Sequence, residues 1–205
     1  MKRQPIIAIE GIDGSGKTTI AKLLSEELGM LYLKTPDKPF SLIRKYFDQK
    51  YTDPRVRMHF YIGCLWDAYI KAFRASMDQG VILDRYILST AAYHSVLCGK
   101  NYDAKKIIEL SSPPPADLNI LLKADIYTSQ KRILERCAEN CDSELEKDIG
   151  FQEEVSKVLE EFSDVTICNE NRAVTETAEE CKLFINELIR DKNYKNYEKY
   201  EYYEK

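Results

Sequence analysis

Apolar residues recur along this chain in two patterns: short apolar runs of strand length, and longer stretches with an apolar residue every three or four positions. The short runs predict buried strands and the longer stretches predict amphipathic helices. The predicted strands are 5–9, 30–34, 81–83, 118–122 and 165–168. The predicted helices are 19–28, 40–47, 53–79, 89–97, 102–110, 129–137, 151–162 and 175–192. Because strands and helices alternate, we expect an α/β fold with a five-stranded parallel sheet flanked by helices in three layers.

The segment between the first strand and the first helix carries the strongest chemical signal. Residues 11–18 read G-I-D-G-S-G-K-T and fit the phosphate-binding pattern G-x-x-x-x-G-K-[ST]. A loop that wraps a phosphate turns backbone N–H groups inward, which favours glycine, and the helix that follows adds its free amides. A lysine and a threonine complete the pattern as a mobile cation and a hydroxyl for magnesium. The predicted nucleotide-binding residues are Gly11, Asp13, Gly14, Ser15, Gly16, Lys17, Thr18 and Thr19.

Two further groups of charged residues are candidates for the same site. Asp84-Arg85-Tyr86 directly follows the strand 81–83. Ligands of open α/β sheets bind beyond the carboxyl ends of the strands, so this triplet is expected to face the glycine loop. A local ion pair that only ends the strand is the alternative. Arg132 and Arg136 lie four apart on one helix face, which suits either a functional pair or a solvated surface stripe.

Composition narrows the class of protein. The 205 residues suit one domain, and 44% hydrophobic and 31% charged residues are typical of soluble proteins. The net charge of -4 and the lack of a long basic stretch argue against a nucleic acid partner. No apolar run reaches the roughly 20 residues of a membrane span, and the first residues lead straight into a strand, so we expect no membrane partner and no signal peptide. Six scattered cysteines suit reduced thiols in the cytoplasm.

Three segments leave alternatives open. Cys137 and Cys141 could share a helix face, but a metal site would need more ligands, and neither His59 nor His94 is near them in sequence. Residues 138–150 are polar and acidic, which suits a mobile lid or an exposed turn. Residues 193–205 are almost only Tyr, Lys, Glu and Asn, and they either prolong the last helix or form a frayed tail. We therefore expect one domain over 1–192, with a lid near 138–150 and a separate tail.

Taken together, these motifs resemble the thymidylate kinase family of nucleoside monophosphate kinases. Residues 9–19 are similar to its phosphate loop, residues 84–93 to its D-R-Y-x-x-S-x-x-A-Y segment, and residues 113–118 to its proline-rich entry to the fourth strand. The resemblance covers about 5–162. It implies a P-loop kinase fold and transfer of the γ-phosphate of ATP, with Mg2+, to a nucleoside monophosphate, thymidylate in particular. Members of that family are commonly homodimers through the long helix and its neighbours, and the apolar and aromatic residues between Tyr61 and Phe73 permit the same interface here.

The resemblance further implies roles in phosphoryl transfer, a reaction that depends on positioning and charge neutralisation. Lys17 would follow the transferred phosphoryl group, and Thr18, with Asp84 through water, would hold magnesium. Arg85 would grip the acceptor phosphate. Asp13 would bind the 3′-hydroxyl of the acceptor sugar or help at the magnesium. The predicted catalytic residues are Lys17, Arg85, Asp13, Arg132 and Arg136, of which the last two lie where the family places lid arginines.

The predicted acceptor site departs from the family pattern. The long helix of the family carries F-x-x-x-R-W-E, whose Phe stacks on thymine and whose Arg contacts its O4; here Tyr61 can stack, but Leu65 stands at the arginine position. Leucine cannot donate a hydrogen bond to a base. Thr35 replaces the phenylalanine before Pro36, and the usual Asn or Gln near Thr90 is missing. The predicted acceptor-binding residues are Asp13, Pro36, Lys38, Tyr61, Leu65, Arg85, Ser89 and Tyr93, of which Tyr93 would pack on the deoxyribose.

These departures keep other functions open. One is a kinase of a different acceptor: another pyrimidine nucleotide, a modified nucleotide or a nucleoside. A catalytically weak relative is another, because the loop has Gly14 instead of arginine and Lys147 is the only cation in 138–150. A regulatory GTPase is disfavoured, because N-K-x-D is absent and D-x-x-G occurs only inside the loop, from Asp13 to Gly16.

Overall fold

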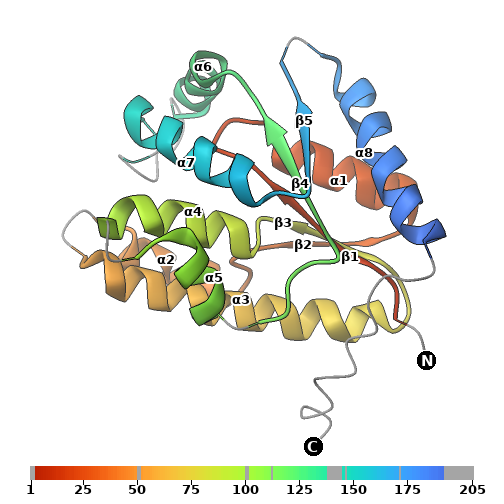
Figure 1. Cartoon of the computed structure of the whole chain (residues 1–205), viewed down its shortest axis with the longest axis horizontal. Coiled ribbons are helices and arrows are strands. Elements are labelled where there is room, and N and C mark those ends of the chain that lie inside the picture. The colour runs from red at the N-terminus through yellow and green to blue at the C-terminus, as the bar shows by residue number, and fades with distance from the viewer. Residues whose placement is uncertain are drawn as a thin grey trace, which may run out of the picture.

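Within the residues that the structure describes, five parallel strands form one sheet in the order β2-β3-β1-β4-β5 (Figure 1). This computed structural model describes residues 3–49, 52–99, 102–111, 113–137, 145, 147–170 and 172–191, with the backbone only at 136 and 137. The strands are β1 (Ile6–Glu10), β2 (Leu31–Lys34), β3 (Val81–Asp84), β4 (Leu118–Lys123) and β5 (Val165–Cys168). The helices are α1 (Lys17–Leu28), α2 (Phe40–Phe47), α3 (Pro54–Ser76), α4 (Ile87–Cys98), α5 (Ala104–Ser111), α6 (Ile126–Cys137), α7 (Ile149–Phe162) and α8 (Val174–Arg190).

Helices cover both faces of the sheet, with α1 and α8 on one side and α3, α4 and α5 on the other (Figure 1). Alternate residues of β1 therefore enter different cores. Ile7 and Ile9 pack in a buried cluster with residues of α1 and α8, such as Ile20 and Ile185. Ile6 and Ala8 belong to a second cluster with residues of α3. A parallel strand that is buried on both faces has to be apolar throughout, which explains the uninterrupted apolar run in the sequence.

The predicted three-layer α/β architecture is confirmed, and each predicted element is present with ends that differ by about one helical turn or less. The carboxylate of Asp53 caps α3 by accepting a hydrogen bond of 2.8 Å from the backbone N–H of Arg55. The long helix ends at Ser76 instead of near Gln79, and residues 77–79 form a turn. The hydroxyl of Ser76 donates a hydrogen bond to the carbonyl of Phe73 in the last turn of the helix. No helix in the described ranges is long and apolar enough to cross a bilayer.

The register of β1 and β3 brings the candidate residues together. These strands are neighbours, and Ile9 is paired with Asp84. The backbone N–H of Arg85 continues the pairing with a hydrogen bond of 3.1 Å to the carbonyl of Ile9. The glycine loop after β1 and the charged triplet after β3 therefore leave the same edge of the sheet side by side, where ligands of such folds bind.

Candidate active site

The glycine loop joins β1 to α1, and the backbone requires its glycines at two points. Gly14 has a φ of 78°, and a Cβ there would lie 2.4 Å from the carbonyl oxygen of Ser129 in α6. Gly16 is the N-cap of α1, with a φ of 92° and no side-chain cap among the described residues. The first amides of α1 are therefore available to an anion, as the sequence pattern predicts.

Lys17 lies inside this loop with its side chain almost fully buried. Its Nζ donates to the carbonyl of Ile12 and lies 3.4 Å from Oγ of Ser15. Burial and, to a smaller extent, the nearby charge of Arg85 lower the pKa of Lys17 to about 7, although Asp13 and Asp84 act in the opposite direction. A phosphate bound in the loop would place negative charge next to Nζ, which raises the pKa of Lys17 and favours its charged form. Lys17 is therefore suited to stay with a phosphoryl group during transfer.

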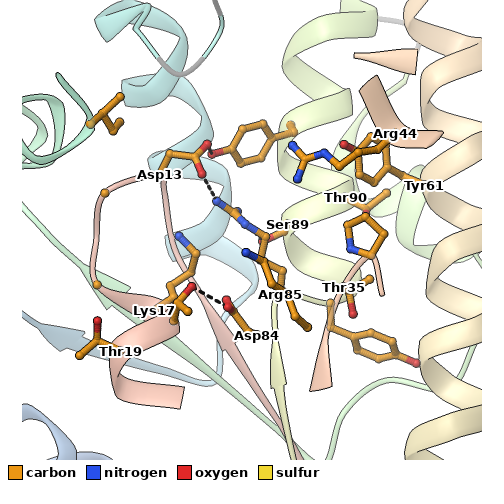
Figure 2. Close-up of a pocket in the computed structure, with 18 of the residues that line it drawn as sticks. Asp13, Lys17, Thr19, Thr35, Arg44, Tyr61, Asp84, Arg85, Ser89 and Thr90 are labelled. Carbon is orange, nitrogen blue, oxygen red and sulfur yellow. Dashed lines mark hydrogen bonds and ion pairs between the residues drawn. The ribbon is translucent and has the colours of Figure 1, made fainter. Parts of the chain in front are cut away.

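Asp84 ends β3 and is buried next to the first turn of α1 (Figure 2). Its Oδ2 accepts hydrogen bonds from the hydroxyl of Thr18 at 2.6 Å and from the hydroxyl of Tyr32 at 3.0 Å. Burial and the neighbouring Asp84 raise the pKa of Tyr32, so Tyr32 remains a donor at neutral pH. Two hard oxygen groups thus lie together beside the phosphate loop, which is chemistry that magnesium prefers.

A second cluster faces the loop from β3 and α4. An ion pair joins Nη2 of Arg85 to Oδ1 of Asp13, as Figure 2 shows. The hydroxyl of Tyr93 donates a hydrogen bond of 2.7 Å to Oδ2 of the same carboxylate. The guanidinium of Arg85 also lies 5.3 Å from the centre of the Tyr93 ring. Burial acts to lower the pKa of Arg85, but the charge of Asp13 holds it above its ordinary value, so this cation is permanent.

Arg85 is held in an unusual backbone conformation, with a φ of 71°. Its Nη1 donates to the carbonyl of Gly11 and to Oγ of Ser89, both at 3.1 Å. The hydroxyl of Ser89 donates in turn to the buried carboxylate of Glu10, which also accepts from the backbone N–H of Tyr86 at 2.9 Å. These bonds offset the strain of a left-handed residue that is not glycine, and such strain concentrates at functional sites.

A cleft of about 570 Å³ opens between these groups. It is lined by thirteen of the predicted site residues: Asp13, Gly14, Gly16, Lys17, Thr18, Thr19, Pro36, Tyr61, Asp84, Arg85, Ser89, Tyr93 and Arg132. Gly11 and Ser15 belong to the loop but do not line the cleft. The guanidinium of Arg132 lies over the loop and donates a hydrogen bond of 3.2 Å to the carbonyl of Gly14. The side chain of Arg136 lies outside the described atoms.

The predicted lid and tail are mostly outside the described residues. Of the lid range 138–150, residues 138–144 and 146 are not described, and residues 149 and 150 begin α7 after the N-cap Asp148. Residues 192–205 are not described either. The lid and the tail therefore stay predictions.

Leu65 is a correction to the predicted site. Its side chain is fully buried, does not line the cleft, and packs in the core with residues such as Ala8, Leu83 and Ala68. Tyr61, one turn earlier on α3, does reach the cleft. The stripe of α3 that contains Leu65, Ala68 and Ala72 covers the sheet, so a leucine at this position serves packing, and it cannot contact a base there.

Lys38 is a second correction, because it is exposed and does not line the cleft. Lys34, at the end of β2, is the lysine that does. The loop that carries Lys38 is tied to α3 through Lys71, whose Nζ contacts the Lys38 carbonyl and the Asp37 carboxylate, each at 3.0 Å. These contacts of Lys71 hold the loop against α3. The lysine that lines this part of the cleft is therefore Lys34 of β2.

The wall of the cleft near Tyr61 contains residues that sequence reasoning missed. The buried carboxylate of Asp48, at the end of α2, accepts hydrogen bonds of 2.9 Å from Nε of Arg44 and from the hydroxyl of Tyr61. It also forms an ion pair of 2.9 Å with Nη2 of Arg57. Arg44 lines the cleft. Two arginines share one carboxylate here, so the wall carries an excess positive charge. Arg44 lies in the last turn of a short helix, where a cation is common, so the sequence offered no distinguishing signal.

His94 is the other residue of this wall that sequence reasoning did not assign to the site. It lines the cleft, its ring centre lies 5.4 Å from that of Tyr61, and only 2% of the residue is exposed. Its Nδ1 lies 2.8 Å from the carbonyl of Thr90, while Nε2 is buried without a hydrogen-bond partner among the described residues. Burial lowers the pKa of His94 to about 4, so the ring is neutral at physiological pH. Lys34 and Ile133 also line the cleft and were missed, and the lining is completed by Thr35, Tyr86 and Thr90, which lie in the segments compared with the family above but were not predicted as binding residues.

A phosphate-binding loop at the carboxyl edge of a parallel sheet, facing a second set of charged groups, defines a P-loop enzyme of the nucleotide kinase class. The chain belongs to the thymidylate kinase family, whose family model, described as thymidylate kinase, matches residues 9–181. A probable thymidylate kinase of Picrophilus torridus is 30% identical over 164 residues, which are 74% of this chain and 77% of that protein. A thymidylate kinase of Ehrlichia ruminantium is 29% identical over 198 residues, which are 89% of this chain and 92% of that protein.

Solved structures share the fold. The thymidylate kinase of Candida albicans superposes with a TM-score of 0.71 at 23% identity, and the match covers 94% of each chain. A likeness at this level of identity shows the architecture alone.

Proposed function

We propose that this protein transfers the γ-phosphate of ATP to thymidylate and releases ADP and the nucleoside diphosphate. The observation that carries this proposal is the placement of Asp13. It belongs to the phosphate loop, yet both of its carboxylate oxygens are bound by Arg85 and Tyr93 on the opposite side of the cleft. A loop that binds only a nucleoside triphosphate has no use for such a carboxylate, whereas a site for two substrates does.

The donor half of the site is the loop with α1. Its amides would hold the phosphates, Lys17 would stay with the transferred group, and Arg132 would approach from α6. Thr18 and Asp84 fit magnesium, because both present an oxygen atom beside the loop. Among the described residues, no cluster of three or more His, Cys, Asp or Glu could hold a metal ion. Magnesium held by one or two protein oxygens and the phosphates has no need of such a cluster. The ion would neutralise charge on the phosphates. We place Asp13 on the acceptor side, because Arg85 and Tyr93 already bind its oxygens.

The acceptor half lies across the cleft. Arg85 is the permanent cation closest to the loop, and it would bind the acceptor phosphate and draw it toward the donor. Its backbone strain and its contacts to Gly11 and Ser89 hold the guanidinium in place before substrate arrives. Asp13 and Tyr93 would contact the sugar. Groups that already hold the two substrates in the reacting geometry speed the reaction, because less entropy is lost on reaching the transition state.

The base would lie against Tyr61, beside His94 and Arg44. Since Nδ1 of His94 faces a carbonyl, which only accepts, Nδ1 carries the proton and Nε2 presents a lone pair. A lone pair accepts the N3–H of thymine, and an arginine donates to a carbonyl of the ring. Cytosine has no hydrogen on N3. This wall therefore favours a keto pyrimidine without any contribution from Leu65.

A substrate panel tests the proposal. The protein would be assayed with ATP and each of thymidylate, deoxyuridylate, deoxycytidylate and thymidine, with release of ADP as the readout. We expect thymidylate to give the highest kcat/KM and Lys17→Ala to lose activity by about a thousandfold, as is usual when a main electrostatic group is removed. Turnover of a nucleoside or of deoxycytidylate above that of thymidylate would replace thymidylate as the acceptor. Absence of turnover with all four would support a weak nucleotide-binding relative.

Two further expectations are part of the proposal. We place the protein in the cytoplasm, which agrees with free thiols at Cys64, Cys98, Cys168 and Cys181 among the described residues. We also expect a homodimer through α3. Light scattering at assay concentration would test the second expectation, with a monomeric mass as the contrary result.

A further inference from the structure

Asn169 directly follows β5 and lies behind the phosphate loop, outside the residues that line the cleft. Its side-chain Nδ2 donates a hydrogen bond of 2.7 Å to the carbonyl of Ser15, in the middle of the loop. Its backbone N–H donates a hydrogen bond of 2.7 Å to the carbonyl of Lys123, the last residue of β4. More than nine-tenths of Asn169 is buried. A strand end thus holds the loop by a side chain that belongs to no nucleotide-binding motif of the sequence.

The orientation of the Asn169 amide follows from its two partners. The carbonyl of Ser15 can only accept a hydrogen bond, so the amide NH2 group has to face it. Oδ1 then faces α8, where the hydroxyl of Thr177 donates to it at 2.9 Å. Thr177 is fully buried. If the amide were flipped, two oxygen atoms would meet at the loop, so the Ser15 carbonyl sets the direction of the amide. The hydroxyl of Thr177 stabilises this orientation by donating to Oδ1.

This contact determines the direction of one peptide group of the loop. In a trans peptide the C=O and the following N–H point in opposite directions. Asn169 binds the Ser15 carbonyl from behind, so the N–H of Gly16 is directed to the other side, where Gly16 lines the cleft. The fit is close, because a Cβ on Gly16 would lie 2.9 Å from Nδ2 of Asn169.

We propose that Asn169, stabilised by Thr177, is a positioning residue for the phosphates of the donor nucleotide. It holds the Ser15–Gly16 peptide with the N–H toward the anion before the nucleotide binds, so that no reorientation is needed at that moment. The inference rests on the proposed function in taking the ligand of the loop to be a nucleoside triphosphate. It predicts an effect on donor binding alone, because Asn169 contacts none of the groups on the acceptor side.

Calorimetric titration with ADP tests the proposal on the full chain, together with separate KM values for ATP and for thymidylate. We expect Asn169→Ala to weaken ADP binding and to raise the KM for ATP by about fivefold, the worth of one hydrogen bond. Asn169→Asp keeps the shape but turns an oxygen toward the Ser15 carbonyl, and we expect a loss of about tenfold or more. The KM for thymidylate should change by less than about twofold in both variants.

Two controls separate positioning from charge and from general destabilisation. Cys168→Asp places the same negative charge on the exposed neighbouring residue, and it should change ADP affinity by less than about twofold because exposed charges are screened. Thr177→Val removes only the hydroxyl that stabilises the orientation of the amide and should lower ADP affinity by about threefold, whereas Thr177→Ser should restore it. Thermal unfolding of each variant shows whether it is folded at the assay temperature.

Three results would overturn the inference. Wild-type ADP affinity in both Asn169 variants is the first, and an equal rise of the KM for thymidylate is the second. The third is a loss in Thr177→Ser as large as that in Thr177→Val. If the variants show any of these results while the wild-type protein turns over thymidylate, the proposed function stands and only the inference about Asn169 fails. If the wild-type protein does not bind ADP, both the proposed function and this inference fail.

Discussion

The hydroxyl of Tyr93 donates a hydrogen bond of 2.7 Å to the carboxylate of Asp13, across the cleft that separates α4 from the phosphate loop. Asp13 lies in the loop that we propose binds the donor phosphates, and Tyr93 lies in the wall that we propose faces the acceptor. Their contact means that the two substrates of the proposed reaction share one side chain of the loop. Arg85 binds the second oxygen of the same carboxylate, so this carboxylate connects the two halves of the proposed site.

Asp13→Asn tests this shared position. The amide keeps the shape but loses the charge that holds Arg85 and Tyr93, and hydrogen bonds to a charged group are worth about 1.5–3 kcal/mol each. We expect the KM for thymidylate to rise by about tenfold or more, with a smaller change in the KM for ATP. Tyr93→Phe is the matched variant and should show part of the same effect. Equal changes in both KM values would mean that Asp13 serves the donor.

Lys17→Met tests the buried ammonium group through stability instead of activity. Because the folded-state pKa of about 7 lies below the ordinary value of 10.5, the unfolded chain binds more protons between these values, and stability rises with pH across this window. Methionine has no charge to bury. The gain in melting temperature from Lys17→Met, measured without ligand, should therefore be largest near pH 6.5 and shrink toward pH 10. A gain that does not depend on pH would contradict the buried charge.

His94→Leu and His94→Gln test the proposed contact with the base. Leucine removes the lone pair on Nε2, so we expect kcat/KM for thymidylate to fall by about tenfold and the preference over deoxycytidylate to decrease. Glutamine retains an acceptor oxygen and should preserve most of that preference. If the preference for thymidylate survives in His94→Leu, the base is selected by other groups, of which Arg44 is the next to test.

The neutral state of His94 also predicts a dependence of stability on pH. Its folded-state pKa of about 4 lies below the ordinary value of 6.5, so the unfolded chain binds the extra proton in this window, and stability falls as the pH decreases from 6.5 toward 4. Acid unfolding followed by circular dichroism should be less steep for His94→Gln than for the wild-type protein. Parallel curves for the two proteins would exclude this contribution.

Leu65→Ala separates packing from recognition. A fully buried leucine truncated to alanine typically costs about 2–5 kcal/mol of stability, so the free energy of unfolding in urea should drop by this amount while the KM for thymidylate stays within about twofold. Leu65→Met, which keeps the volume, should cost less than about 1.5 kcal/mol. A selective rise of the KM for thymidylate in Leu65→Ala, without loss of stability, would return Leu65 to the acceptor site.

Local signals in the sequence were enough to predict the fold. The apolar run at residues 5–9 and the glycine pattern at 11–18 depend only on neighbouring residues, and both appear in the structure where they were expected. The same holds for the Asp53-Pro54 start of α3. These features depend on backbone preference and on burial of a single element, and neighbouring residues already specify both.

Contacts between distant elements could not be predicted in this way. Leu65 and Tyr61 lie one helical turn apart, but the angle at which α3 packs on the sheet sends one side chain into the core and the other into the cleft. Tertiary packing also explains why the cleft is lined by Lys34 instead of Lys38. It explains in the same way why Arg44 lines the cleft while Asp48 binds its guanidinium. Helical periodicity shows which residues share a face, but it does not show what that face meets.

By itself, the sequence determined that this protein has a phosphate-binding loop between a buried strand and a helix, and that Asp84 and Arg85 follow another buried strand at the same edge of a parallel sheet. The tertiary structure alone decided that Asp13 turns toward Arg85 and Tyr93, that the buried ring of His94 lies beside Tyr61, and that Asn169 holds the loop from behind. The physical reason is that a motif is a property of adjacent residues. A pocket and its supports depend on how helices and strands far apart in the chain pack against one another.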